Sequence, residues 1–171
     1  MACIFMTLAP LPADGIVRLE VTVKPEWLDY NDHMNVAWYV AAFDLGIDAF
    51  KDVIGITLDY IAREQRSTVA LEAHITYQRE AHRDQLLRVE TRIVDFDGKR
   101  VHIYQELWRD DELLATQETL SISFDTAARR SCPFADDMAA RYRTMLEAAS
   151  SLPRPTWLGR TIGIRQGKPA G

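Results

Sequence analysis

One long amphipathic helix limits what this chain of 171 residues can fold into. Apolar side chains recur at spacings of three and four from Val36 to Ile54, and Gly55 is a suitable stop. Asp32 or Asn35 can cap the start of this helix. A helix of about 18 residues is longer than the average helix of globular proteins, so its apolar stripe needs a wide surface to cover it.

The other periodic segments alternate between apolar and polar residues, as strands do. The first spans residues 16–25, where Pro25 ends it, and four more are predicted at 68–77, 87–93, 101–108 and 113–124. A helix follows at 133–149. Asp97-Gly98 is a two-residue hairpin signal, and the four consecutive strands, joined by short turns, are expected to pair antiparallel. In the strand at 68–77, the residues expected to share one face are Val69, Leu71, Ala73, Ile75 and Tyr77.

A single antiparallel sheet wrapped around one long central helix covers all these apolar faces at once. This is the layout of the hotdog fold, which belongs to the α+β class. We expect one domain at residues 16–150, including the C-terminal helix, between a flexible N-terminal segment at 1–15 and an extended tail at 151–171. An isolated sheet leaves an edge strand unpaired, which favours a homodimer or tetramer formed by sheet extension.

The acidic composition narrows the classes of partner. A net charge of −5 and a pI of about 5.4 argue against a broad nucleic-acid surface, which needs a basic face. Cys3 and Cys132 are too few for a disulfide framework or a zinc ligand set, and they fit a reducing, cytoplasmic setting. Residues 1–12 lack the basic start of a signal peptide, and no stretch approaches the roughly 20 apolar residues that span a membrane.

Four polar residues alternate just where the long helix begins: Asp29, Asn31, His33 and Asn35. A helix start exposes unpaired backbone N–H groups at the positive end of the helix dipole. Such a place can hold a developing oxyanion while side chains deliver water or protons. The cluster therefore predicts an enzyme, in which Asn31 orients water or a carbonyl and His33 donates or accepts a hydrogen bond.

The run Asp-x-Asn-x-His-x-Asn, followed by Tyr39, resembles the active-site segment of hotdog acyl thioesterases. The plant acyl-ACP thioesterases carry a similar run, and the resemblance implies functional roles for Asp29, Asn31 and His33. The 4-hydroxybenzoyl-CoA thioesterase family keeps the aspartate and the tyrosine, and binds the thioester carbonyl with a helix-start amide that matches the backbone N–H of Val36. In those relatives a glycine commonly precedes the histidine, where this chain has Asp32.

Most similar are bacterial thioesterase-like proteins found with carnitine catabolism, some of which hydrolyse betainyl-CoA. Shared features are Pro25-Glu26-Trp27, the helix at 35–48 and the segment from Arg129-Arg130 to Pro133-Phe134. The resemblance covers roughly residues 17–134 and implies a thioesterase for a small acyl-CoA, with betainyl-CoA as one candidate. Two other hotdog functions stay open: an enoyl-CoA hydratase or dehydratase, and a non-catalytic acyl-CoA-binding protein.

The mechanism that the resemblance implies leaves the role of Asp29 open between a general base on water and a nucleophile that forms an anhydride. Predicted substrate-binding residues are Asn35, Trp38, Tyr39, Lys99, Arg100 and Arg130. The basic ones, together with Arg129, either meet the phosphates of CoA or are ordinary surface charge. The aromatic residues near the cluster, including Trp27 and Tyr30, either contact a trimethylammonium group by cation–π interaction or pack in the core.

Further acidic and imidazole groups follow in the strand at 68–77 and after it. Glu72 and His74 share one strand face, and Glu80 follows. These residues either supply a second carboxylate near the site across a dimer interface or form a plain solvated face. Asp29 and His33 are four residues apart, and the other candidate metal ligands are His74, His82 and His102. Without a helix across residues 29–33, the spacing of Asp29 and His33 does not aim both at one ion. No known ligand pattern occurs, so we expect no metal and no cofactor, CoA being part of the substrate.

Overall fold

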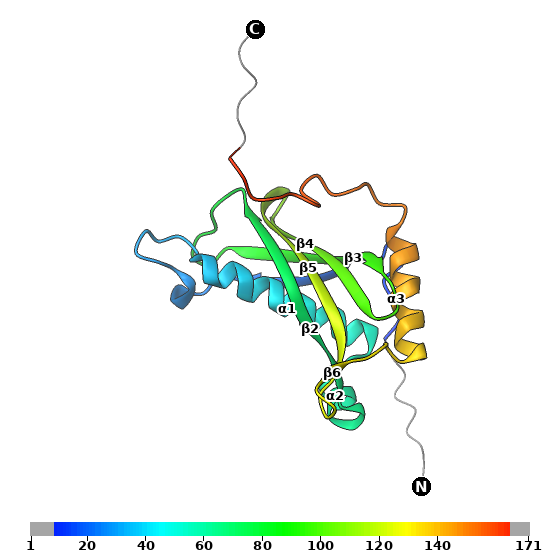
Figure 1. The fold of residues 1–171 in the computed structure, drawn as a ribbon. Coiled ribbons are helices and arrows are strands. Elements are labelled where there is room, and N and C mark those ends of the chain that lie inside the picture. Colours follow the sequence, from blue (N-terminus) through cyan, green and yellow to red (C-terminus); the bar gives the residue numbers. More distant parts are fainter. Residues whose placement is uncertain (1–8, 165–171) are drawn as a thin grey trace.

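The long helix forms the centre of the computed structural model, which describes residues 9–164 (Figure 1). It is α1, Val36–Ile54, and both predicted ends are confirmed. The side-chain oxygen of Asn35 accepts a hydrogen bond from the Ala37 N–H, so Asn35 rather than Asp32 is the cap. Gly55 ends the helix with a φ of 105°, a left-handed conformation that glycine adopts without steric cost.

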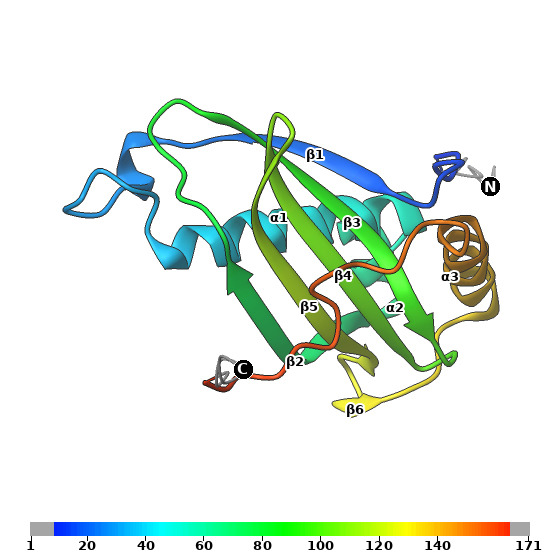
Figure 2. The same cartoon turned by 90° about the horizontal axis from the view of Figure 1, so that it is seen from above.

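One antiparallel sheet curls over α1, as predicted for the hotdog fold (Figures 1 and 2). Its strands are β1 (Val17–Thr22), β2 (Arg66–Tyr77), β3 (Leu86–Phe96), β4 (Arg100–Arg109), β5 (Glu112–Asp125) and the short β6 (Arg130–Ser131). The order is β1-β3-β4-β5-β2, with β6 beside β5. The hairpin β3–β4 confirms the predicted turn at 97–98, and β4 joins β5 through a turn at 110–111.

The expected pairing of the strand at 68–77 with the next strand is wrong. β2 pairs with β5 at one edge of the sheet, and β3 pairs with β1 instead. The physical reason lies in residues 78–85, which are too many for a tight hairpin. The N–H groups of Gln78 and Arg79 both donate to the Leu114 carbonyl, so the chain first continues along β5 and then crosses towards the start of α1.

The expected single face of Val69, Leu71, Ala73, Ile75 and Tyr77 is also wrong, because β2 contains a bulge between Ala70 and Glu72. Ala73 pairs with the buried Thr119, on the face towards α1, whereas Val69 pairs with Ile122 on the other face. The extra residue of a bulge reverses the alternation, which period-two reasoning does not detect.

Two further helices and a single 3₁₀ turn, η1 (Pro25–Trp27), complete the described elements. α2 (Leu58–Glu64) was not predicted, because it has seven residues and only Tyr60 is buried, too few for a periodic signal. α3 (Asp136–Ala149) begins three residues later than predicted, because Ala135 is its extended N-cap residue. None of the described helices has the length and apolar character needed to cross a membrane.

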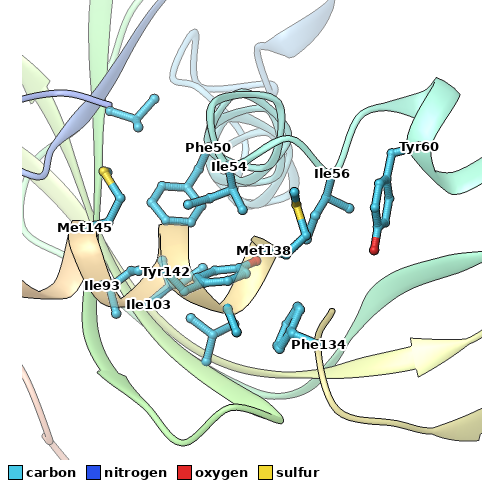
Figure 3. Close-up of a cluster of buried hydrophobic side chains, with 13 residues drawn as sticks. Phe50, Ile54, Ile56, Tyr60, Ile93, Ile103, Phe134, Met138, Tyr142 and Met145 are labelled. Carbon is cyan, nitrogen blue, oxygen red and sulfur yellow. The ribbon is translucent and has the colours of Figure 1, made fainter. Parts of the chain in front are cut away.

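The core divides into two clusters along α1. At the C-terminal half, Phe50 and Ile54 pack against Met138, Tyr142 and Met145 of α3, as Figure 3 shows. At the N-terminal half, buried residues of α1 pack with β1, β3 and the segment that precedes the helix. The members of this second cluster include Tyr39, Ala42 and Phe43 of α1 together with Trp27, Met34 and Val89. The second cluster therefore supports the polar loop at 28–35.

The two ends of the described chain lie against the domain. Residues 150–164 cross the face of the sheet opposite α1 (Figure 2), where Arg92 donates to the Pro153 carbonyl at 3.1 Å and the Gly159 N–H donates to Glu118 at 2.7 Å. Leu11 packs on the first core cluster. Residues 1–8 of the predicted flexible segment and 165–171 of the predicted tail lie outside the described residues, so the boundaries at 16 and 150 stay predictions.

Candidate active site

The polar loop before α1 is closed by backbone hydrogen bonds. The Asp29 N–H donates to the His33 carbonyl at 2.9 Å, and the Asn35 N–H donates to the Trp27 carbonyl at 2.9 Å. Asp32 has a φ of 59°, in the left-handed region that glycine and, less often, aspartate and asparagine adopt. This conformation explains how aspartate replaces the glycine that similar thioesterases carry before the histidine.

The half-buried carboxylate of Asp29 uses one oxygen to hold this loop. Oδ1 accepts hydrogen bonds from the N–H groups of Asn31 at 2.8 Å and His33 at 3.4 Å. Within residues 9–164, Oδ2 has no hydrogen-bond partner. One oxygen thus sets the orientation of the carboxylate, while the other is available for a water molecule or a substrate. The side chain of Asn31 is exposed, so its predicted role stays a prediction.

The start of α1, at the end of the same loop, presents one backbone donor that is free among residues 9–164. The Asn35 side chain accepts a hydrogen bond from the Ala37 N–H at 3.0 Å, and the Asn35 carbonyl accepts one from the Trp38 N–H at 2.9 Å. In the described part of the chain, no acceptor engages the N–H of Val36. It lies at the positive end of a helix of 19 residues, which suits it to an oxyanion.

Tyr39 anchors the neighbouring segment rather than facing solvent. Its hydroxyl donates to the Arg79 carbonyl at 3.3 Å and accepts from the Ala81 N–H at 3.1 Å. Burial raises the pKa of Tyr39, so the hydroxyl stays protonated. The Ala81 carbonyl in turn accepts from the Met34 N–H at 2.8 Å. Tyr39 therefore positions residues 79–82 against the loop, beside its predicted role in substrate binding.

Three groups that sequence reasoning did not bring together meet at this corner. Nδ1 of His33 lies 3.3 Å from Oε1 of Glu80, and the rings of His33 and His82 lie edge to face with centroids 4.9 Å apart. Glu80 thus reaches the site within the same chain, whereas Glu72 and His74 lie on the opposite sheet face near residues 159–161. The alternation of Glu80 and His82 about the apolar Ala81 was the available signal for this arrangement.

The four predicted aromatic residues do not form one cage. Tyr30 is 97% exposed and Trp27 is buried, stacked on the half-buried Trp38 with centroids 5.1 Å apart. Tyr77, which was not predicted as a site residue, packs edge-on against Tyr39 at 5.3 Å and is 49% exposed. Trp38, Tyr77 and the exposed Tyr30 therefore have ring surface left for a ligand.

The predicted CoA-binding cations lie at the other end of α1. Lys99 and Arg100 follow the β3–β4 turn, where the Phe134 N–H donates to the Gly98 carbonyl beside the first core cluster, and Arg130 is in β6. A helix of 19 residues is about 28 Å long, so within one chain these cations are remote from Asp29. Their role stays a prediction.

A different cation lies close to the site. Arg109 donates to the Glu80 carbonyl at 3.3 Å and to the Gln85 side chain at 3.0 Å, and it pairs with Glu112. Sequence reasoning missed it because it ends a strand distant in the chain from the loop. Its guanidinium holds the segment at 80–85 in place.

A groove of about 420 Å³ runs along α1 from its first turn, between the helix and strands β2 and β5. Its walls include Ala37, Val40, Asp44, Ala70 and Ala73. The groove begins one residue from the Val36 N–H and extends under the edge strand β2. It offers room for an acyl group beside the candidate oxyanion donor.

Comparison with known proteins identifies the family. The model of the thioesterase-like superfamily matches residues 23–142, more than half of the chain. The chain belongs to the thioesterase-like superfamily. Its predicted hotdog fold is confirmed by a solved Staphylococcus aureus protein in complex with CoA, which is 26% identical with a TM-score of 0.83 over 88% of this chain and 96% of that one.

Curated and solved relatives in this superfamily are similar over most of the chain. A betainyl-CoA thioesterase from Pseudomonas aeruginosa is 32% identical over 87% of this chain and 95% of its own length. An L-carnitine dehydrogenase/betainyl-CoA thioesterase from Ruegeria pomeroyi is 33% identical over 86% of this chain, which spans 30% of that longer relative. A solved putative thioesterase from Pseudomonas putida is 35% identical with a TM-score of 0.76, covering 86% of this chain and 96% of that one.

Proposed function

We propose that this thioesterase hydrolyses a small acyl-CoA with a cationic acyl group, betainyl-CoA being the first candidate. The observation that carries the proposal is that one hydrogen-bonded loop, at the start of α1, carries two groups without a partner among residues 9–164: Oδ2 of Asp29 and the N–H of Val36. A carboxylate that can activate water and a donor that can hold the developing oxyanion are what thioester hydrolysis needs.

In the proposed mechanism, the thioester carbonyl lies against the Val36 N–H with the helix dipole behind it. Asp29 either removes a proton from water or attacks the carbonyl to form an anhydride that water then cleaves. His33 and Asn31 position the water or assist the departing thiolate. Because a thiolate is a good leaving group, no strong acid is required at this step.

The charge of the corner supports a cationic acyl group. Asp29 and Asp32 lie in the loop before α1, and Glu80 contacts this loop at His33. Along the groove Asp44 is unpaired among the described residues, whereas the lysine of its lining, Lys51, forms an ion pair with Asp48. Trp38 and Tyr77 add ring faces, which attract a quaternary ammonium group by cation–π interaction. The curated relatives named betainyl-CoA thioesterase support the same substrate.

We further propose that the protein forms a homodimer or tetramer through β2. This edge strand exposes apolar side chains, with Val69 at 44% and Leu71 at 55%, and an exposed apolar edge invites pairing with a second copy. A two-fold axis beside β2 would reverse the partner's α1, so Lys99, Arg100 and Arg130 of one protomer would approach the other's site. This arrangement would bring those cations within reach of CoA phosphates.

We expect the double substitution V69K/L71K to dissociate the oligomer, because two added charges oppose strand pairing at that edge. Light scattering during size-exclusion chromatography measures the mass against the 19.5 kDa chain. The matched control is Leu86→Lys, because this leucine is 54% exposed and lies in β3, which pairs with β1 and β4 and not with β2. A monomeric wild-type protein, or an unchanged mass in V69K/L71K, contradicts the proposed interface.

Catalysis is proposed to need no cofactor, and a cytoplasmic location stays a prediction from cysteine usage. The test of function is free-thiol release by purified protein from betainyl, short-chain, long-chain and aromatic acyl-CoAs. Preference for betainyl-CoA supports the full proposal, and preference for another acyl group keeps the mechanism and removes that substrate. Absence of release across the panel contradicts thioester hydrolysis.

A further inference from the structure

The cluster of His33, Glu80 and His82 has the composition of a metal site. One ligand atom from each side chain lies within 4.8 Å of both others. Two imidazole nitrogens and one carboxylate oxygen form a ligand set that zinc enzymes use, with a fourth position left for water. Tetrahedral bonds of about 2.0–2.1 Å require ligand atoms about 3.3–3.5 Å apart, a separation that the His33–Glu80 pair at 3.3 Å already has.

The backbone presents these side chains in a fixed arrangement. Ala81, between Glu80 and His82, is fully buried and hydrogen-bonded to both Tyr39 and Met34. In an extended segment, residues on either side of a buried one point to the same side. The hydrogen bond from the Met34 N–H to Ala81 places the preceding residue, His33, opposite them.

Three more hydrogen bonds hold the segment from its other end. The His82 N–H donates to the Gln85 side chain at 2.8 Å, and Arg109 donates to both the Glu80 carbonyl and that same side chain. The ligand side chains themselves are half-buried or exposed. Rotation about their side-chain bonds can bring the ligand atoms round an ion while the backbone stays anchored.

We propose that His33, Glu80 and His82 bind one divalent transition-metal ion per chain, with Zn²⁺ the best fit to the ligand set. In the described part of the chain, the Glu80 carboxylate has no polar partner besides His33. A simple ion pair would need only these two groups, whereas the third donor, His82, gives the cluster the ligand number of an open zinc site.

Calorimetric titration of the full chain with ZnCl₂ tests the site directly. We expect one ion per wild-type chain, and affinity at least about tenfold weaker in both His82→Asn and Glu80→Gln. The matched control is His74→Asn, because His74 lies on the opposite sheet face. Circular dichroism checks that each variant folds. No zinc binding by the wild type, or equal effects of His82→Asn and His74→Asn, overturns the proposal.

A consequence for catalysis rests on the proposed function. An ion on His33 removes this imidazole from the thioester, so zinc should inhibit wild-type hydrolysis but not that of His82→Asn. Hydrolysis is followed by loss of thioester absorbance, because Zn²⁺ also binds the released thiol. Calorimetry needs no substrate, so it measures zinc binding even if the protein does not hydrolyse any of the tested thioesters. Equal inhibition of both proteins overturns this consequence.

Discussion

Replacement of Asp29 by asparagine is expected to lower the rate of thioester hydrolysis by about 10²–10⁴-fold, the usual contribution of a positioned base. Asparagine keeps the Oδ1 acceptor that binds the N–H groups of Asn31 and His33, so the loop retains its hydrogen bonds. The substitution removes the charge and the basic Oδ2. Steady-state kinetics on the purified variant measures the loss.

The matched control for Asp29→Asn is Asp84→Asn. Asp84 is another loop aspartate, with an exposed side chain and a φ of 61°, and it is not one of the candidate site residues. We expect the control to retain wild-type turnover, and both variants to keep the wild-type melting temperature. Near-normal turnover in Asp29→Asn would remove this residue from the mechanism, whereas a lower melting temperature would indicate a structural role.

A methyl group at position 46 is expected to destabilise the whole domain. A Cβ built on Gly46 lies 2.6 Å from Cγ1 of Val89 and 2.7 Å from Nε2 of Gln105. Gln105 is fully buried and donates to the carbonyl of Phe43 at 2.8 Å and to Thr91 at 3.0 Å. α1 therefore crosses the sheet at Gly46 too closely for any larger residue without disturbing this network.

For Gly46→Ala we expect a loss of about 2–3 kcal/mol in the free energy of unfolding, because overpacking and a displaced buried hydrogen bond outweigh the gain of about 1 kcal/mol in helix propensity. Urea unfolding measures it. In the control Gly163→Ala the new Cβ meets nothing within 4 Å, so stability should not change. Val89→Ala should reduce the cost in a double-mutant cycle. An unchanged free energy of unfolding in Gly46→Ala would mean that the sheet moves enough at this crossing to accommodate the methyl group.

Local signals made the centre of the fold predictable. The helix from Val36 to Ile54 has a cap, an apolar stripe and a glycine stop, so its bounds follow from adjacent residues alone. The Asp97-Gly98 hairpin is equally local. The partner of β2 was not predictable in this way, because it depends on where residues 78–85 find their hydrogen bonds. The bulge at Ala70 and the short α2 left no periodic trace.

In the candidate site, too, contacts within one segment were predictable and contacts between distant segments were not. Asp29, Asn35 and the Val36 N–H lie within one short segment, so their proximity follows from the sequence order. Glu80 and His82 reach His33 only because Ala81 is bound to Met34 and Tyr39, a contact between distant segments. The distance of Lys99 and Arg100 from this corner likewise depends on the length and direction of α1.

The most direct test of the account compares betainyl-CoA with 3,3-dimethylbutanoyl-CoA, a neutral acyl-CoA of the same shape with carbon in place of the quaternary nitrogen. Rates of thiol release by the wild-type protein and by Asp29→Asn are measured for both. We expect a kcat/KM at least about tenfold higher for betainyl-CoA, since a desolvated cation–π contact and acidic neighbours contribute about 2 kcal/mol. We also expect Asp29→Asn to lose both activities. Absence of thiol release from both thioesters, or equal rates with the two, would contradict the proposed function.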